Sequence, residues 1–445
     1  MQRITAALAL SVATVATGLL LGACNDTTNP NNTGNTETTA TPAANSTTPA
    51  SSAKGLKIGT LLPTTGDLAS IGQQMVGAVP LLVDSVNACG GVNGEPVTLV
   101  EVDDQTDPKA GAAGITKLAN VDKVAGVVGS FASSVSSAAV SIAVPNKVML
   151  ISPGSTSPVF TDKAQKGEYK GFWARTAPPD TYQALALAQL AKKKGYKRVS
   201  TVVINNDYGV GFEKAFVETF EKLGGTVVNK AKPVRYDPKA QTFDTEAAAA
   251  FAGKPDAVLG VLYAETGSLF LKAAYQQGVT KGVQILLTDG VKSDTFPEQV
   301  GKRSADGKFL LAGAIGTVPG SDGKALDALK KLWQEKKSGT PGEYVPQSWD
   351  AAALLVLAAQ AAKENTGVGI AGKLREVANG AGRDSTEVTD VCQGLKLLKE
   401  GKKINYQGAS GNVDIDANGD VVGVYDVWTV GDDGKLKTID KVSPK

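Results

Sequence analysis

Short apolar runs alternate with amphipathic segments through most of this chain, and this alternation limits the folds open to it. The segments between the runs have helical spacing, as at Gln73–Asn87, Thr181–Lys194, Gly211–Leu223 and Ser348–Lys363. Strands that are apolar along their whole length are typical of parallel sheets covered by helices on both faces. From Gly55 onward the expected strands are Leu56–Leu62, Val97–Asp103, Val124–Gly129, Val148–Ser152, Arg198–Ile204, Ala257–Leu262, Gln284–Thr288 and Phe309–Ile315.

The length of the chain indicates two domains. Its 445 residues exceed what one hydrophobic core usually serves, and the strand–helix units are too many for one sheet. We therefore expect an α/β protein with two doubly wound parallel sheets, each in its own lobe. In such sheets ligands bind at the carboxyl ends of the strands.

The composition argues against several functions. The chain has no histidine, which excludes a Ser-His-Asp triad, a Cys-His dyad and an HExxH metal site. Lys and Arg total 46 against 44 Asp and Glu, and no basic tract stands out, so nucleic acid is not expected as a partner. Ser-Lys or carboxylate-pair chemistry stays open on composition, but no spacing supports it. We expect a binding protein without catalytic residues, metal or cofactor.

The amino terminus has the pattern of an export signal, with Arg3 followed by an apolar run from Ile4 to Leu21. The run closes on Leu21-Gly22-Ala23-Cys24, which resembles the lipobox of bacterial lipoproteins. In that family the cysteine thiol, here that of Cys24, carries the lipid. A plain cleaved signal and an uncleaved anchor are the alternatives. Residues 25–54 have almost no large apolar side chain, so we expect them to form a disordered tether.

A series of short motifs follows in the order found in one bacterial family. They are Ile58-Gly59-Thr60-Leu61-Leu62-Pro63, Gly90-Gly91-Val92-Asn93-Gly94, Asp103-Asp104 with Asp107-Pro108, Val127-Val128-Gly129-Ser130, Ile151-Ser152-Pro153, and Arg175-Thr176 before Asp180. Together they resemble the periplasmic leucine/isoleucine/valine-binding proteins of bacterial ABC importers. The resemblance runs from about Gly55 to the end of the chain, with insertions near the C-terminus.

This resemblance implies the type I periplasmic-binding-protein fold, in which a three-segment hinge joins two lobes. Lobe one would comprise residues 55–177 and 318–418, and lobe two residues 178–317 and 419–445. The implied function is that of an exported, lipid-anchored and monomeric solute-binding protein, which captures an amino acid between its lobes and passes it to a membrane permease. An amide, urea or small carboxylate as the ligand, a sensor role, and a structural envelope lipoprotein stay open.

A pocket for an amino acid must satisfy two opposite charges, since burying either one unpaired is costly. Carboxylates favour hydroxyl groups and the backbone N–H groups at a helix start. Ser133 follows the expected strand that ends at Gly129, and Thr156 follows the strand that ends at Ser152. Both match ligand residues of the family, and Gly154 matches the position whose carbonyl meets the ammonium group. Helix capping or turn formation is the alternative role for the two hydroxyls.

Lobe two is expected to hold the ammonium group. Asp289 follows an apolar strand at a position where the family has an acidic residue, although Asp-Gly is also a common turn. Tyr208 and Tyr263 match tyrosines that line the family's cleft, and the alternative for each is a half-buried core aromatic.

The side-chain compartment departs from the family pattern. The family has an aromatic residue near the first glycine loop, where this chain has Ser70 or Ile71, and Phe131 takes a position that is commonly aliphatic. The resemblance therefore does not extend to specificity for branched-chain amino acids.

Cys89 and Cys392 remain once Cys24 is set aside. Export favours one disulfide between them, and two unpaired thiols are the alternative.

Two motifs indicate sites that their context does not support. Residues 367–372 spell GxGxxG but follow a helix instead of a strand, so we interpret them as a helix–helix connection. Asp414, Asp416 and Asn418 resemble the start of a calcium loop, but the twelfth position is Tyr425. A hairpin turn is the interpretation we favour there.

Overall fold

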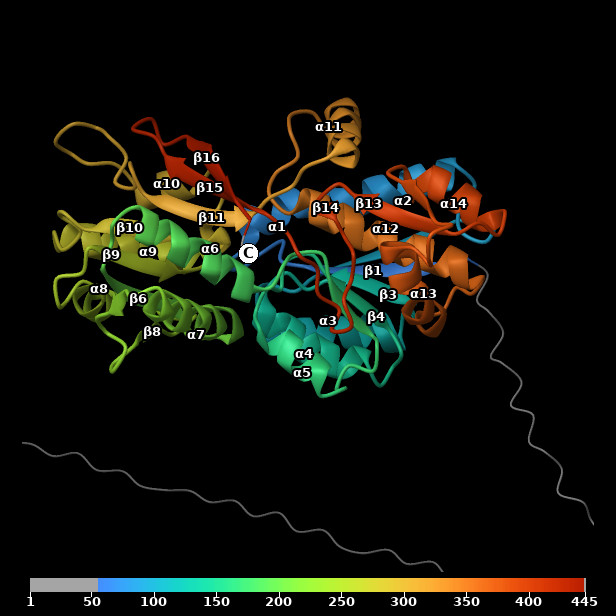
Figure 1. Ribbon diagram of the computed structural model, residues 1–445, viewed down its shortest axis with the longest axis horizontal. Coiled ribbons are helices and arrows are strands. Elements are labelled where there is room, and N and C mark those ends of the chain that lie inside the picture. The colour runs from blue at the N-terminus through green and yellow to red at the C-terminus, as the bar shows by residue number, and fades with distance from the viewer. Residues whose placement is uncertain (1–54, 444–445) are drawn as a thin grey trace, which may run out of the picture. The chain divides into compact units, whose positions relative to one another are not determined.

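The computed structural model describes residues 55–443 (Figure 1). The expected signal segment, the lipidation site at Cys24 and the tether lie outside the described residues. Within residues 55–443, no helix is long and apolar enough to cross a membrane.

The first sheet has five parallel strands in the order β2-β1-β3-β4-β5. Alternate strand residues enter two different apolar clusters, so both faces are covered. Helices α2 (Ala78–Ala88) and α12 (Val345–Ala362) belong to one cluster, and α3 (Pro108–Asn120) and α4 (Ser133–Ala143) to the other. The strands are β1 (Lys57–Leu62), β2 (Thr98–Asp103), β3 (Gly126–Gly129), β4 (Met149–Ser152) and β5 (Trp173–Arg175).

The second sheet has the order β16-β15-β11-β10-β9-β6-β7, with β8 paired to β6. Its central strands are parallel, and β15 and β16 are antiparallel additions from the end of the chain. The strands are β6 (Arg198–Ile204), β7 (Thr226–Val227), β8 (Val234–Tyr236), β9 (Ala257–Val261), β10 (Gln284–Leu287), β11 (Ile315–Pro319), β15 (Tyr425–Val430) and β16 (Leu436–Val442). The helices that accompany this sheet are α6 (Asp180–Lys193), α7 (Asp207–Lys222), α8 (Asp244–Ala250), α9 (Ala264–Gln276), the short η1 (Asp289–Val291) and α10 (Phe296–Val300).

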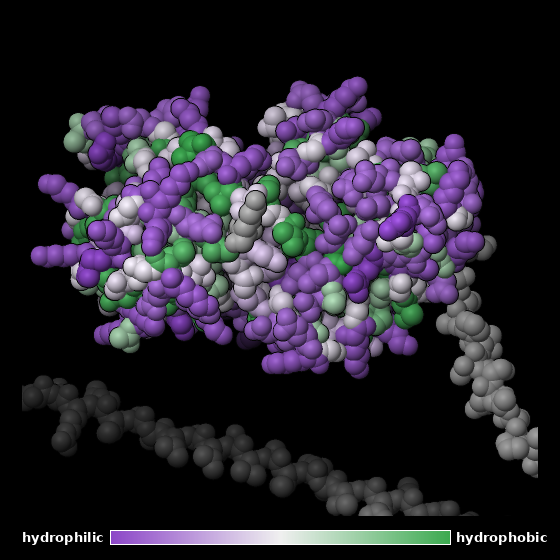
Figure 2. All heavy atoms as spheres, viewed as in Figure 1, coloured by the Kyte–Doolittle hydropathy of each residue, from purple (hydrophilic) through white to green (hydrophobic). Residues whose placement is uncertain are grey.

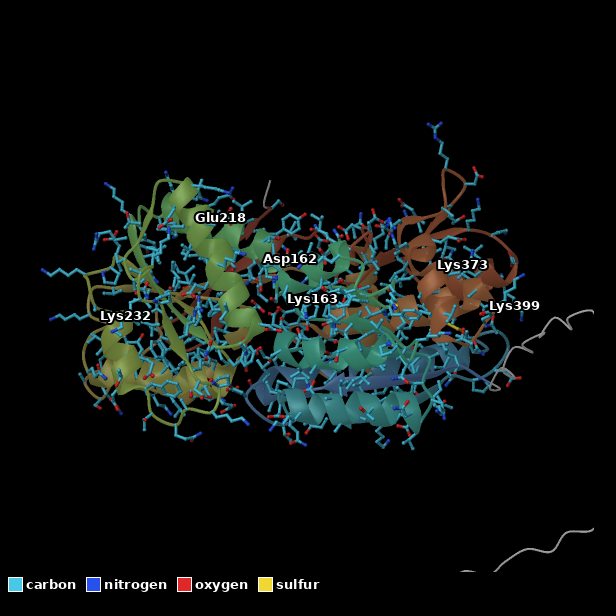
Figure 3. All side chains as sticks on the ribbon, turned by 90° about the horizontal axis from the view of Figure 1, so that it is seen from below. Asp162, Lys163, Glu218, Lys232, Lys373 and Lys399 are labelled. Carbon is cyan, nitrogen blue, oxygen red and sulfur yellow. A yellow bond between two sulfur atoms is a disulfide. The ribbon has the colours of Figure 1, made fainter. Side chains whose placement is uncertain are left out.

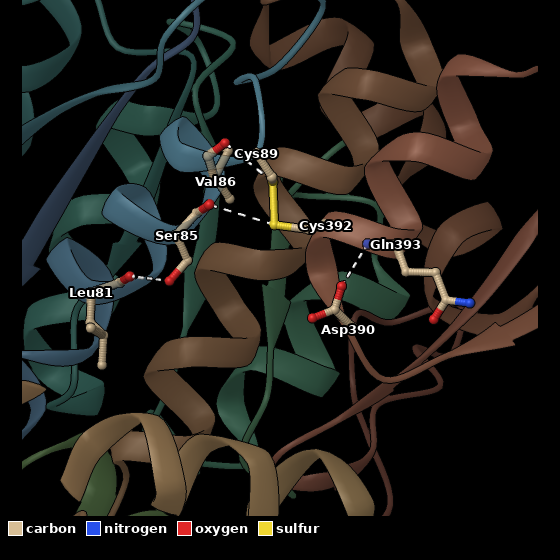
Figure 4. The surroundings of a disulfide bond; sticks show 7 residues. All are labelled: Leu81, Ser85, Val86, Cys89, Asp390, Cys392 and Gln393. Atoms are coloured by element: carbon tan, nitrogen blue, oxygen red, sulfur yellow. Dashed lines mark hydrogen bonds between the residues drawn. A yellow bond between two sulfur atoms is a disulfide. The ribbon is translucent and has the colours of Figure 1, made fainter. Parts of the chain in front are cut away.

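A C-terminal group of elements packs on the first sheet through α12, which is almost wholly buried. Figure 1 shows α12 and α13 beside β3 and β4, with α14 on the outer side of α12. Cys89 at the end of α2 is disulfide-bonded to Cys392 in α14, with 5.9 Å between the two Cα atoms (Figure 4). The group comprises α13 (Gly367–Asn379), α14 (Val391–Lys399), β12 (Thr386–Val388), β13 (Ile404–Gly408) and β14 (Gly411–Asn412); the remaining helices are α1 (Ala69–Met75), α5 (Val159–Gln165) and α11 (Lys324–Lys336).

We call the first sheet with its helices lobe one and the second sheet with its helices lobe two. The chain passes between the two sheets three times, after β5, after β11 and after β14. The expected α/β class with two doubly wound parallel-sheet lobes and a three-segment hinge is confirmed. The residue limits of the lobes stay a prediction, and β11 of the second sheet extends two residues past the limit placed at 317.

The surface is mainly polar. Figure 2 shows hydrophilic residues over most of the visible face, with apolar residues in small groups. Charged side chains such as Glu218 of α7, which is well exposed, and Lys373 of α13, which is partly exposed, contribute to this surface (Figure 3). Apolar residues that lie on the surface singly or in small groups, as in Figure 2, are normal for a folded protein.

Three expected elements differ from the structure. The strand expected at Phe309–Ile315 is wrong, because successive turns occupy the stretch before Ile315. Its apolar residues are buried without strand pairing, and Phe309 packs against Gly434 in the β15–β16 turn. The helix expected at Gln73–Asn87 breaks at Val76 and Gly77 into α1 and α2. The GxGxxG motif forms the first turns of α13 and not the connection before it.

Candidate ligand-binding site

The strand order of both sheets brings the loops that follow their parallel strands together in one region. In the first sheet β1 lies between β2 and β3, so the chain runs away from it in both directions, and such switch points hold the ligands of open α/β sheets. The residues that follow the strands of lobe one are Leu68 after β1, Phe131 and Ser133 after β3, and Gly154 after β4. Those that follow the strands of lobe two are Tyr208 after β6, Tyr263 after β9 and Asp289 after β10.

These residues line one small cavity of about 10 Å³ between the lobes. A space of this size holds about one water molecule, so the cleft is closed and must open to admit a solute. The structure brings together five of the six predicted ligand residues in this lining, and Thr156 is buried outside it. The lining consists of Leu68, Phe131, Ala132, Ser133, Gly154, Tyr208, Tyr263, Asp289 and Gly290.

The Asp289 carboxylate is buried and held by three donors from three elements. It accepts hydrogen bonds from Gln183 Nε2 (2.9 Å), Tyr208 Oη (2.9 Å) and Tyr344 Oη (2.7 Å). Burial raises the pKa of Asp289, and these hydrogen bonds act in the opposite direction. Among residues 55–443, no Lys or Arg forms an ion pair with it. The carboxylate therefore has neutral hydrogen-bond donors but no paired cation among the described residues.

Asp180, which sequence reasoning did not place in the site, is a second buried carboxyl in this region. It begins α6, and Gln183 lies one turn further on the same face of that helix. Both carboxyl oxygens of Asp180 and the hydroxyl of Thr156 beside it lack hydrogen-bond geometry with any described residue. Burial raises the pKa of Asp180 well above its ordinary value, and the Asp289 carboxylate raises it further. Two carboxyls thus share one region, and the charge of Arg175 offsets only part of the rise in the pKa of Asp180.

The lobe-one side of the cavity has the chemistry of an anion site. Ser133 is the first residue of α4, and no described side chain caps this helix. Its N-terminal N–H groups and the positive end of its dipole therefore remain suited to a carboxylate. The Ser133 hydroxyl accepts a hydrogen bond from the backbone N–H of Ser157 (3.3 Å). A Cβ atom on Gly154 would lie 2.0 Å from the Phe131 ring, so glycine is needed there for close packing.

Aromatic rings form the rest of the wall. Tyr208 and Tyr263 stack with 5.6 Å between centroids, and Phe131 meets Tyr344 edge to face at 4.7 Å. The Tyr263 hydroxyl is buried without a partner among the described residues. Leu68 lines the cavity, in the region where the sequence pointed to positions 70 and 71.

Polar contacts also connect the two lobes around the cavity. The Asp67 carboxylate accepts hydrogen bonds from the backbone N–H (2.8 Å) and hydroxyl (2.6 Å) of Thr266, in the first turn of α9. The Ser137 hydroxyl of α4 donates to Asp207 at the start of α7 (2.5 Å). These contacts form only when the lobes meet, so they stabilise the closed state.

The acidic stretch near the C-terminus forms a turn. Asp416 accepts hydrogen bonds from the backbone N–H groups of Asn418 and Asp420. Asp420 pairs with the fully buried Arg175 at 2.7 Å. Among the described residues, no cluster of acidic, cysteine or histidine side chains could hold a metal ion.

Gln183, Tyr344 and Asp180 are the residues that sequence reasoning missed. Asp180 and Gln183 follow the Arg175-Thr176 motif, at the start of the helix expected at Thr181–Lys194. Their spacing of three residues places them on one face of that helix, and this spacing could have identified them. Tyr344 lies in a loop with a left-handed backbone (φ 63°), and no local pattern marks it.

The two doubly wound lobes and the enclosed cavity between them define a solute-binding protein. The chain belongs to the family described as the receptor family ligand binding region, whose model matches residues 74–433. Members and structural neighbours of this family bind solutes and are not enzymes.

Named relatives and solved structures agree with this assignment. The chain is 28% identical over 366 residues to the chemotactic signal transduction system substrate-binding protein BasB of Halobacterium salinarum, covering 81% of this chain and 83% of that protein. The leucine binding protein LivK of Thermotoga maritima superimposes with a TM-score of 0.72 and 25% identity, covering 87% and 99% of the two chains. An ABC transporter solute binding protein of R. palustris, solved with benzoate, has the same fold at 20% identity, a TM-score of 0.68 and coverage of 88% and 97%.

Proposed function

We propose that this protein captures a free α-amino acid between its lobes, with the ligand ammonium at Asp289 and the ligand carboxylate at Ser133 and the start of α4. The observation that carries this proposal is the Asp289 carboxylate, which is buried and hydrogen-bonded by three neutral donors but forms no ion pair with any Lys or Arg of residues 55–443. A ligand ammonium satisfies that charge, and the uncapped start of α4 satisfies the carboxylate. Thr156, Gly154, Tyr208 and Tyr263 complete the proposed contacts.

Contacts from both lobes make closure depend on the ligand. A solute held by Asp289 in lobe two and Ser133 in lobe one uses both charges only when the cleft is closed, so binding shifts the population toward that state. The proposal includes anchoring through a lipid on Cys24 outside the cell membrane and delivery of the solute to an ABC permease. The leucine binding protein LivK among the structural relatives supports the amino-acid assignment.

The test is thermal unfolding of the protein after it has been unfolded and refolded to remove bound solutes. A ligand at 100 times its dissociation constant adds about 2.7 kcal/mol to the free energy of unfolding, which gives a clear rise in the melting temperature. We expect such a rise with at least one class of L-amino acids and no rise with the matching amide that lacks the carboxylate. A rise with amides or ureas alone refutes the proposal.

A second candidate ligand is a small aromatic carboxylate. The stacked rings of Tyr208 and Tyr263 with Phe131 provide an aromatic wall, and the start of α4 suits a carboxylate without an ammonium. Replacing Asp289 by Asn separates the two candidates, because only amino-acid binding should weaken. The name of the BasB relative makes a chemotaxis receptor an alternative recipient to a permease, and loss of uptake on deletion of the gene would favour the permease.

A further inference from the structure

A much larger hollow of about 610 Å³ lies next to the small cavity. Its walls come from α1, from the segment after η1, from α11 and from the loop at residues 337–344. The side chains used in the argument below are Gln73, Gln74, Lys292, Asp294, Lys337 and Glu343.

The same segments form walls of both spaces. Gly290 lines the cavity, and Lys292, two residues further on, lines the hollow. Leu68 precedes α1 and lines the cavity, whereas Gln73 in that helix lines the hollow. The cavity and the hollow thus share these two segments in their walls.

A third segment that contacts both spaces is the loop that ends at Tyr344. Tyr344 donates to Asp289 of the cavity (2.7 Å), and the preceding Glu343 pairs with Lys292 of the hollow (2.6 Å). Lys292 is 11% exposed and Glu343 34% exposed at the side chain. Both contacts join the loop to lobe two, so opening of the lobes breaks them together and connects the two spaces.

The chemistry of the hollow differs from that of the cavity. Lys292 and Lys337 balance Asp294 and Glu343, so its lining has no net charge. Two glutamine amides add further donors and acceptors at the α1 wall. Such a lining can hydrogen-bond a polar group of either charge, but it would leave its own polar groups unpaired against an aliphatic side chain.

We propose that the hollow is the outer compartment of the ligand site and receives the side chain of an amino acid that is long and ends in hydrogen-bonding groups, as in glutamine, citrulline or arginine. This inference rests on the proposed capture of an amino acid. The cavity has room for about one water, so it must widen even to hold the charged groups of the ligand at Asp289 and Ser133, and the side chain needs further space beyond it. The adjoining hollow provides that space, and its polar lining favours a side chain with hydrogen-bonding groups.

The test fills the hollow without touching the cavity. Asp294 is exposed and lines the hollow, and Asp294→Trp places an indole in it. Asp294→Ala is the control for loss of the carboxylate. Glu298→Trp, an exposed position of α10 outside the lining, is the control for a surface indole. Dissociation constants for L-leucine, L-glutamine, L-citrulline and L-arginine are measured by calorimetry on each protein.

We expect at least one of the three long polar amino acids to bind at least tenfold more tightly than leucine. Asp294→Trp should weaken that ligand at least tenfold and by more than Asp294→Ala does, whereas Glu298→Trp should change it by less than twofold. If Asp294→Trp does not fold, Lys337→Trp fills the hollow from the end of α11, with the neighbouring exposed Lys336→Trp as its control.

The outcomes separate this inference from the function on which it rests. Tightest binding of leucine, or equal affinities in the filled variant and its controls, overturns the outer compartment and leaves amino-acid capture intact. Absence of binding by every amino acid overturns both.

Discussion

Asp289→Asn should separate the role of this carboxylate in ligand binding from its role in the fold. The substitution keeps the shape of the side chain but removes the charge that we assign to the ligand ammonium. Loss of one partner from a buried, hydrogen-bonded charge pair costs about 2–5 kcal/mol, which is roughly 30-fold to several thousand-fold in the dissociation constant. Affinity for the best amino acid should fall by that factor.

The ligand-free protein should respond in a different way. The side-chain oxygen of the new asparagine can still accept from Gln183 and Tyr208, and the Tyr344 hydroxyl can turn to accept from the new amide. Removal of the negative charge also relieves Asp180, whose pKa the Asp289 carboxylate helps to raise. At neutral pH the free energy of unfolding should therefore stay within about 1 kcal/mol of the original value, the worth of one hydrogen bond, or increase.

Calorimetric titration gives the affinity, and urea unfolding without ligand gives the stability. Glu298→Gln, which removes an exposed carboxylate outside both the cavity and the hollow, is the matched control and should change neither. Unchanged affinity for amino acids together with a clear loss of stability would refute the reasoning, because Asp289 would then stabilise the closed lobes and not the ligand.

Three further predictions concern neighbouring features. Burial raises the pKa of Asp180 above 3.8, so its protonated form favours the fold and stability declines as pH rises, by at most about 1.4 kcal/mol per pH unit. Asp180→Asn should remove that decline. In urea unfolding, the free energy of unfolding of the variant should therefore exceed that of the original protein by an amount that increases between pH 4 and pH 8. Gly154→Ala should weaken ligand binding, because the new methyl group displaces the Phe131 ring, and adding Phe131→Leu should restore part of the affinity in calorimetry. Replacing Cys89 and Cys392 by Ser should lower the free energy of unfolding by up to about 5 kcal/mol, since the bond spans 303 residues, and should leave ligand affinity unchanged.

The fold and most of the candidate site could be predicted because they depend on local patterns. An apolar run followed by a polar residue marks the end of a strand, and the ends of parallel strands meet at one edge of a sheet. Ser133, Tyr208 and Asp289 each follow such a run, and the structure places all three around one cavity. Their roles toward a ligand stay predictions.

The parts that could not be predicted depend on contacts between distant segments. Tyr344 reaches Asp289 from a loop whose path is set by packing between the lobes, and the residues around it have no strand or helix periodicity. The stretch from Phe309 has the composition of a strand, but Phe309 packs against the β15–β16 turn, and the backbone forms turns with isolated hydrogen bonds to Gly301 and Val430. A short apolar run has the same pattern in the sequence whether its residues form a paired strand or are buried in turns.

The three passages of the chain between the sheets have a consequence for how the protein matures. Lobe one needs α12, which ends at Ala362, over its first strands, and lobe two needs β15, which begins at Tyr425, beside β11, so each lobe waits for a segment far along the chain. Cys89 likewise waits for Cys392, near the end of synthesis. Each lobe therefore gathers its core from segments that are distant in the sequence, and its formation depends on long-range contacts. A premature stop before α12 leaves neither lobe intact, and a stop between β14 and β15 removes two strands from the sheet of lobe two.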